Sequence, residues 1–172
     1  MKKFIKVPLP RFNRPANLPC MFLVLFAIQF SAGAFGAPAQ EGGAIFKNAE
    51  EKEWMLLEFR SGGKTVTINR QKIEADLGKV YVIYFFEDGR AGGVGAPNRF
   101  NAPWSAGANR SLTIGNIAST MMMAFREPDE LKESEYFSYL SGVSRWDLRE
   151  GKLELYSTDS AGVETVLVFV TN

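Results

Sequence analysis

The stretch from Tyr81 to Phe125 constrains the fold more than any other part of the chain. It begins with the apolar run YVIYFF, reverses at Asp88-Gly89, crosses a glycine-rich segment and continues into a Leu-Thr-Ile strand. The apolar run predicts a central strand with both faces covered. The Asp-Gly pair supplies the positive-φ residue that a tight hairpin needs. This stretch therefore predicts antiparallel strands joined by short turns.

Strand patterns continue on both sides of this stretch. Alternating apolar residues predict further strands at residues 53–59, 65–69, 143–148, 153–156 and 165–170. Between them the period changes, and Tyr136, Phe137 and Leu140 form the stripe of a helix that we expect to begin near Pro128 and to end at Gly142. The pattern predicts a compact antiparallel α+β domain, barrel-like, with about seven or eight strands and one helix.

The first 39 residues differ in character from the rest. Five Lys and Arg residues precede the apolar run MFLVLFAIQF at 21–30, and small residues ending in Ala37-Pro38-Ala39 follow it. This order is typical of a secretory signal peptide cleaved after Ala39, and the alternative is an uncleaved membrane anchor. We expect residues 1–39 to be a signal peptide, 40–50 a flexible lead-in and 51–172 the domain, exported to the periplasm or cell envelope.

Composition excludes several kinds of chemistry in the exported part. The sequence has no histidine, and its one cysteine, Cys20, lies ahead of the apolar run. Cysteine nucleophiles, Ser-His-Asp triads and the common zinc sites all need an imidazole or a thiolate. Of 20 basic and 19 acidic residues, five basic ones fall in residues 1–39, which leaves a net charge of −4. An acidic domain lacks the positive surface that nucleic acids require. We expect no metal, no cofactor and no nucleic-acid partner.

The order of the motifs resembles the META domain, the HslJ-like family of small bacterial envelope proteins. The residues that carry the resemblance lie in the middle of the chain and are Asp88, Gly89, Gly95, Asn98, Phe100 and Thr120. The family commonly has one cysteine just before the asparagine and a second after the threonine-methionine stretch, and this chain has neither. The resemblance implies a META-like fold and an association with envelope stress tolerance, and it brings no catalytic motif.

Asn98, Arg99 and Trp104 are the most site-like group, because they combine an amide, a guanidinium and an amphipathic aromatic near a glycine-rich loop. Such residues are enriched in recognition surfaces, so they are our candidates for partner binding. The structural interpretation, which the residue types favour, is that Asn98 bonds loop backbone, Arg99 packs its stem, and Phe100 and Trp104 fill the core.

Two further motifs have a structural and a functional interpretation. Gly92, Gly93 and Gly95 predict bulges or close backbone approach rather than a phosphate loop, since no Lys-Ser/Thr pair follows them. The run Met121–Met123 offers soft ligands for Cu(I), but successive strand residues point to opposite faces. We therefore expect these methionines to pack in the core.

Three acid pairs, Glu87-Asp88, Asp129-Glu130 and Glu133-Glu135, offer an acid and a base for glycoside cleavage. Each lies in a predicted turn or on a polar helix face, where carboxylates are solvated. No catalytic residue is predicted from them.

We expect a non-enzymatic interaction or stress-tolerance module whose partner is an envelope protein or a cell-wall component. Membrane contact is expected only through an uncleaved N-terminal segment. The alternative is a carrier of a lipid or another small apolar ligand, with a cavity lined by Phe85, Trp104, Met122 and Phe169. A carboxylate-dependent hydrolase is the third hypothesis.

Overall fold

The structure is a computed structural model that describes residues 46–122, 128 and 130–171. The expected signal peptide, Met123 and Asp129 lie outside the described residues. The strands are β1 (Glu53–Ser61), β2 (Lys64–Thr67), β3 (Val82–Phe85), β4 (Arg90–Val94), β5 (Arg99–Ala106), β6 (Leu112–Ile114), β7 (Ala118–Ser119), β8 (Val143–Arg149), β9 (Lys152–Thr158) and β10 (Glu164–Thr171). The helices are α2 (Arg70–Leu77), the 3-10 turn η1 (Ala108–Arg110) and α3 (Glu133–Ser141).

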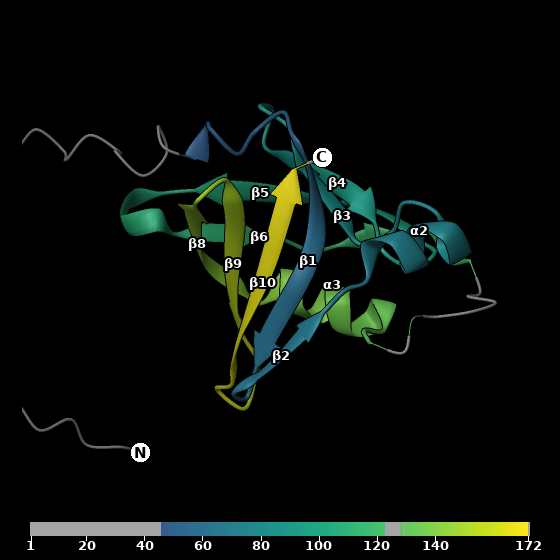
Figure 1. The fold of residues 1–172 in the computed structure, drawn as a ribbon. Coiled ribbons are helices and arrows are strands. Elements are labelled where there is room, and N and C mark those ends of the chain that lie inside the picture. The colour runs from purple at the N-terminus through teal and green to yellow at the C-terminus, as the bar shows by residue number, and fades with distance from the viewer. Residues whose placement is uncertain (1–45, 123–127, 129, 172) are drawn as a thin grey trace, which may run out of the picture. The chain divides into compact units, whose positions relative to one another are not determined.

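All strands join one antiparallel sheet in the order β6-β5-β4-β3-β1-β10-β9-β8, with β2 added to β1 and β7 added to β5. A bridge between Ser111 and Arg145 brings the two edges of the sheet together, so the sheet forms a nearly closed barrel (Figure 1). The prediction of an antiparallel, barrel-like architecture is therefore confirmed. The described residues hold ten strands and two complete α-helices, more than the seven or eight strands and one helix expected.

The Asp88-Gly89 reversal forms as predicted and joins β3 to β4. Gly89 has φ +81°, and the Phe86 N–H donates to the Arg90 carbonyl at 2.8 Å. The glycine-rich crossing is itself strand β4, which sequence analysis missed. A Cβ at Gly93 would lie 2.0 Å from the Val82 carbonyl oxygen, so the predicted close backbone approach occurs inside a strand.

The two helices differ from the prediction for different reasons. Helix α2 was missed because Ile73 is its only buried residue, which leaves no apolar stripe to recognise. Helix α3 begins at Glu133 rather than near Pro128, and the buried Leu131 lies just before it. Tyr136 and Leu140 face the core as the stripe predicts. Neither helix is long and apolar enough to cross a membrane, and the described residues contain no other that is.

The packed domain begins earlier than expected. Residues 40–50 were predicted to be a flexible lead-in, but Phe46 and Ala49 are both fully buried. The Phe46 ring centroid lies 4.9 Å from those of Trp104 and Trp146. An aromatic ring at the centre of such a cluster buries a large apolar surface, which holds this segment against the barrel.

Candidate functional site

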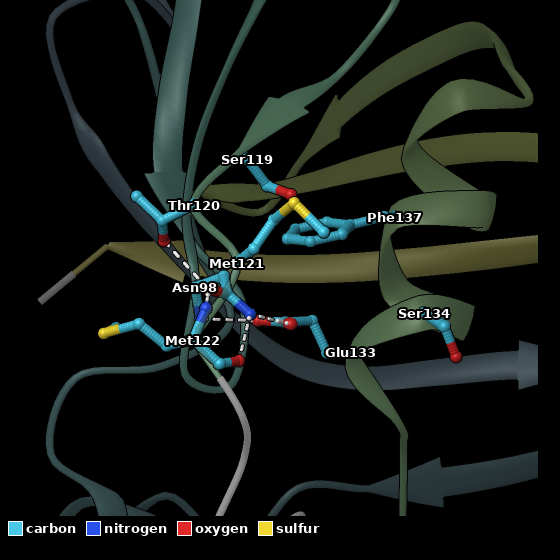
Figure 2. A pocket seen from close by; sticks show the side chains of 8 residues that line it. All are labelled: Asn98, Ser119, Thr120, Met121, Met122, Glu133, Ser134 and Phe137. Atoms are coloured by element: carbon cyan, nitrogen blue, oxygen red, sulfur yellow. Dashed lines mark hydrogen bonds between the residues drawn. The ribbon is translucent and has the colours of Figure 1, made fainter.

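Asn98 is the centre of a hydrogen-bonded group that joins three segments distant in sequence. Its side chain is buried, with 6% of the residue exposed. The Asn98 Nδ2 donates to Glu133 Oε2 at 2.6 Å and to the Met122 carbonyl at 3.2 Å. The Asn98 Oδ1 accepts from the Met122 N–H at 2.7 Å and from Thr120 Oγ1 at 2.9 Å (Figure 2). Both donors and both acceptor positions of the amide are therefore used. We call Asn98, Thr120, Met122 and Glu133 the Asn98 knot.

Glu133, in the first turn of α3, docks the helix on the turn between β4 and β5. Its Oε1 accepts from the backbone N–H groups of Ala96 and Asn98, each at 2.6 Å. A Cβ at Gly95 would lie 2.5 Å from this oxygen and 2.8 Å from the Phe137 ring. Glycine at position 95 therefore lets the carboxylate reach the turn. The Ala96-Pro97 peptide bond in this turn is cis.

An open groove of about 510 Å³ lies between the segment around β7 and helix α3. It is lined by Asn98, Ser119, Thr120, Met121, Met122, Glu133, Ser134 and Phe137. Met121 is 98% exposed and Met122 is 55% exposed, so the prediction that these methionines pack in the core is wrong. Strand β7 is only two residues long, and both methionines follow its end. Figure 2 shows the Met121 side chain directed toward the Phe137 ring.

A second, smaller groove of about 250 Å³ shares Ser119 and Thr120 with the first. Its lining also includes Arg99, Phe100, Asn101 and Ala118. Phe100 is buried and Arg99 is exposed, as expected for neighbours on a strand. The Arg99 guanidinium has no ion pair or hydrogen bond with another of the described residues. A free guanidinium head is compatible with a packed stem, so the expectation that the Arg99 stem is packed stays a prediction.

The predicted group of Asn98, Arg99 and Trp104 is only partly brought together. Asn98 and Arg99 adjoin the grooves, but Trp104 lies at the other end of β5. The Trp104 Nε1 donates to the carbonyls of Phe86 and Arg90 at 3.1 and 3.0 Å. Its ring is partly buried and packs against the core, whereas the structural interpretation placed it inside.

Sequence analysis missed the groove residues that come from α3. Glu133 and Phe137 were placed in a helix, but no local pattern links them to a turn 35 residues earlier. The acid pairs also separate. Glu135 Oε2 accepts from the Lys132 N–H at 3.0 Å, and Asp88 Oδ2 binds Arg90 Nη2 at 2.7 Å. None of the described acid pairs therefore presents two carboxylates to the groove.

A different carboxylate organises the outer side of β8. Asp147 is 2% exposed, and its Oδ2 accepts from Arg149 Nε at 2.6 Å while its Oδ1 accepts from the Leu148 N–H at 2.8 Å and from Arg110. Burial by itself raises the pKa of Asp147, but these hydrogen bonds and the two guanidinium charges outweigh burial and lower the pKa. The carboxylate stays ionised and fully engaged. We call Asp147, Arg110 and Arg149 the Asp147 cluster.

Glu154 of β9 stands directly across from Asp147 in the sheet. It is 8% exposed, accepts from Tyr156 Oη at 2.6 Å and pairs with Arg60 at 3.3 Å. Burial and the hydrogen bond to Glu154 raise the pKa of Tyr156. Neither Asp147 nor Glu154 lines either of the two grooves.

The residues expected to line a lipid cavity lie in different surroundings. Phe85 and Phe169 are fully buried, and the Phe85 ring packs against Trp104 at 5.5 Å. Met122 instead lines the open groove. The four side chains therefore do not surround one cavity, and carrier activity stays a prediction. Within the described ranges, no group of three or more His, Cys, Asp or Glu side chains is arranged to hold a metal ion.

The fold and site define a small, nearly closed β-barrel domain whose helix α3 packs against β9 and β6. The META domain model matches residues 47–169, and the chain belongs to the META domain family. The resemblance drawn from Asp88, Gly89, Gly95, Asn98, Phe100 and Thr120 is confirmed.

Two solved structures share the fold. One is the NMR structure of a protein from Burkholderia xenovorans, with a TM-score of 0.54 and 18% identity over 79% of this chain and 92% of that one. The other is the crystal structure of a DUF4847 family protein from Bacteroides vulgatus, with a TM-score of 0.51 and 14% identity over 74% of this chain and 97% of that one. At such identities the likeness shows the fold alone. No curated protein matched the sequence.

Proposed function

We propose that this chain is an exported, non-enzymatic protein of the bacterial cell envelope that binds a protein partner at the groove between β7 and α3. The observation that carries the proposal is the exposure of Met121, which is 98% exposed beside the Phe137 ring. Methionine side chains are flexible and polarisable, and they are over-used on surfaces that bind other proteins. Contiguous apolar surface that is left in solvent marks interaction sites.

The Asn98 knot supports this proposal because it fixes both walls of the groove. Met122 is held through its N–H and its carbonyl, and Glu133 holds the first turn of α3 to the β4–β5 turn. The backbone of the groove is therefore set before a partner arrives. A preorganised site loses less conformational entropy on binding.

The absence of catalysis is part of the proposal and is supported by the state of the acids. Glu133 lines the groove, but three N–H donors engage its two oxygens. The lowered pKa of Asp147 removes it as a proton donor near neutral pH. A carboxylate-dependent hydrolase needs one free base and one free acid facing the same substrate.

Export is supported by the order of basic, apolar and small residues within 1–39. Mass measurement of the chain from the envelope fraction of its own host tests this step. A polypeptide that begins at Gln40 is expected. An intact chain that begins at Met1 in the membrane fraction would replace export and cleavage by anchoring.

Site-specific photo-crosslinking in growing cells tests the partner. A crosslinking amino acid at Met121 is expected to form discrete adducts with an envelope protein, because this side chain lines the groove and is 98% exposed. The matched control places the same amino acid at Thr65, an exposed position of β2. Identical adducts at both positions, or none at Met121, would contradict the proposal. In a strain that lacks this protein, the wild-type chain is expected to restore tolerance to envelope stress, and the Met121→Thr variant is expected not to.

A further inference from the structure

We propose that the partner docks as an extended peptide strand along the free edge of β7, with an apolar side chain in the groove beside Met121 and an adjacent acidic side chain at Arg99. This inference rests on the proposed function and deepens it. It names the chemistry of the partner segment, which is an apolar residue followed or preceded directly by Asp or Glu.

The backbone of β7 leaves one edge open. Among the described residues β7 pairs only with β5, through Ser119 with Phe100 and Ala118 with Asn101. The Thr120 N–H donates to the Arg99 carbonyl at 3.0 Å. In an antiparallel pair the residues alternate in the direction of their N–H and C=O groups, so the groups of Ser119 point away from β5. Ser119 and Ala118, the two residues of β7, are both exposed. An unpaired edge of this kind can accept an added strand.

The two grooves lie along this edge and differ in chemistry. Ser119 and Thr120 line both of them. The larger groove offers the Met121 thioether and the Phe137 ring, and the smaller one offers the Arg99 guanidinium. Consecutive side chains of an added strand point to opposite sides of the sheet. A docked strand therefore places one residue in the apolar groove and directs the next toward Arg99.

Charge complementarity selects an acidic residue for the second position. Arg99 is exposed and has no acidic partner among the residues the structure describes. The nearest acid of the groove, Glu133, is engaged by three N–H donors of the Asn98 knot and does not approach Arg99 within ion-pair distance. A carboxylate accepts the fork of guanidinium N–H donors in a bidentate pair, which a neutral side chain does not match.

Selection from a phage-displayed library of random dodecapeptides against the purified full-length chain tests the inference. The enriched peptides are expected to share an adjacent apolar and acidic residue. With Arg99→Glu as the bait, the acidic position is expected to become Lys or Arg. With Lys64→Glu, a matched charge reversal on the exposed strand β2, the selected sequences are expected to stay the same.

Strand pairing is tested on one selected peptide by N-methylation of its backbone amides. Methylation removes an N–H donor, and only every second amide of an added strand faces β7. One alternating set of methylated amides is expected to weaken binding about tenfold or more, while the other set changes it by less than about twofold. Equal losses in both sets would overturn the docking of a strand at this edge.

The outcomes separate this inference from the proposed function. Selected peptides that lack the apolar-acidic pair, or that ignore Arg99→Glu, overturn the strand inference, while adducts at Met121 still support a partner at the groove. Loss of the Met121 adducts ends the proposed function whatever the peptides show. A dimer of the chain that Ser119→Pro dissolves would also overturn the inference, because a second copy would then occupy the edge.

Discussion

The Asn98 knot and the Asp147 cluster each use a carboxylate to tie two parts of the fold together, but the donors differ. Glu133 is held by two backbone N–H groups and an amide. Asp147 is held mainly by Arg110 and Arg149, whose side chains are 49% and 65% exposed. Donors on the backbone are fixed by the fold, whereas guanidinium groups reach in from solvent and can be hydrated again. The stability that the Asn98 knot contributes should therefore depend on how closely its groups fit. The stability that the Asp147 cluster contributes should depend on charge.

The largest effect is expected from Asn98→Ala. This change leaves the Met122 N–H and one Glu133 oxygen without their partner. These groups are part-buried, so each should cost toward the lower end of about 1–3 kcal/mol, and the free energy of unfolding should fall by about 2–3 kcal/mol. Urea denaturation measures it. Asn101→Ala, at an exposed position of β5 three residues after Asn98, is the control and should change stability by about 0.5 kcal/mol or less. Equal losses of stability in the two variants would show that the hydrogen bonds of the Asn98 knot add no stability of their own.

Gly95→Ala should come next and should be coupled to Glu133. The new Cβ would lie 2.5 Å from Glu133 Oε1, and overpacking of this kind costs about 1–3 kcal/mol. In a Glu133→Ala background the carboxylate is gone, so the same change should cost less by about 1 kcal/mol. A double-mutant cycle with urea denaturation measures the difference. Additive losses would contradict the assignment of Gly95 as the opening for Glu133.

Asp147→Asn should have a smaller effect that depends on pH. At pH 7 the free energy of unfolding should fall by about 1–2 kcal/mol. The loss stays this small because the exposed arginine side chains are hydrated when the carboxylate is gone. The pKa of Asp147 is lowered in the folded chain, so its stabilisation is complete above the unfolded pKa of about 3.9. This contribution disappears as the pH falls through the folded pKa.

Urea denaturation of wild type and Asp147→Asn at several pH values from 7 downward measures this change. The two chains should approach the same stability in acid. Asp76→Asn, at an exposed position of α2, should show little difference at any pH. A gap between wild type and Asp147→Asn that stays constant with pH would show that shape rather than charge matters in the cluster.

The smallest effect is expected at Tyr136, on α3 one turn after Glu133. Its buried hydroxyl has no hydrogen-bond partner in the described part of the chain. Removing a polar group that is already unsatisfied costs little and can stabilise, so Tyr136→Phe should change stability by less than about 0.5 kcal/mol or raise it. The neighbouring Tyr81 hydroxyl donates to the Leu131 carbonyl, and Tyr81→Phe should cost about 1 kcal/mol. Thermal unfolding of both variants provides the comparison.

The sequence by itself determined the local elements of this protein. Period-two patterns located β1, β9 and β10, and Asp88-Gly89 located the β3–β4 hairpin, because alternation and positive φ depend only on neighbouring residues. The same local order was sufficient to recognise the META family. Sequence analysis missed helix α2 because a helix with one buried residue has no periodic pattern of apolar residues.

Only the tertiary structure decided the site. Asn98 and Glu133 are 35 residues apart, and Arg110 and Asp147 are 37 apart. No local pattern encodes which distant donor meets which carboxylate, because that depends on how the sheet closes and where the helix docks. The same reason explains the error at Met121 and Met122. An apolar run predicts burial, but the run is buried only if another element covers it. Here β7 ends before the two methionines and α3 does not cover them, so they stay exposed.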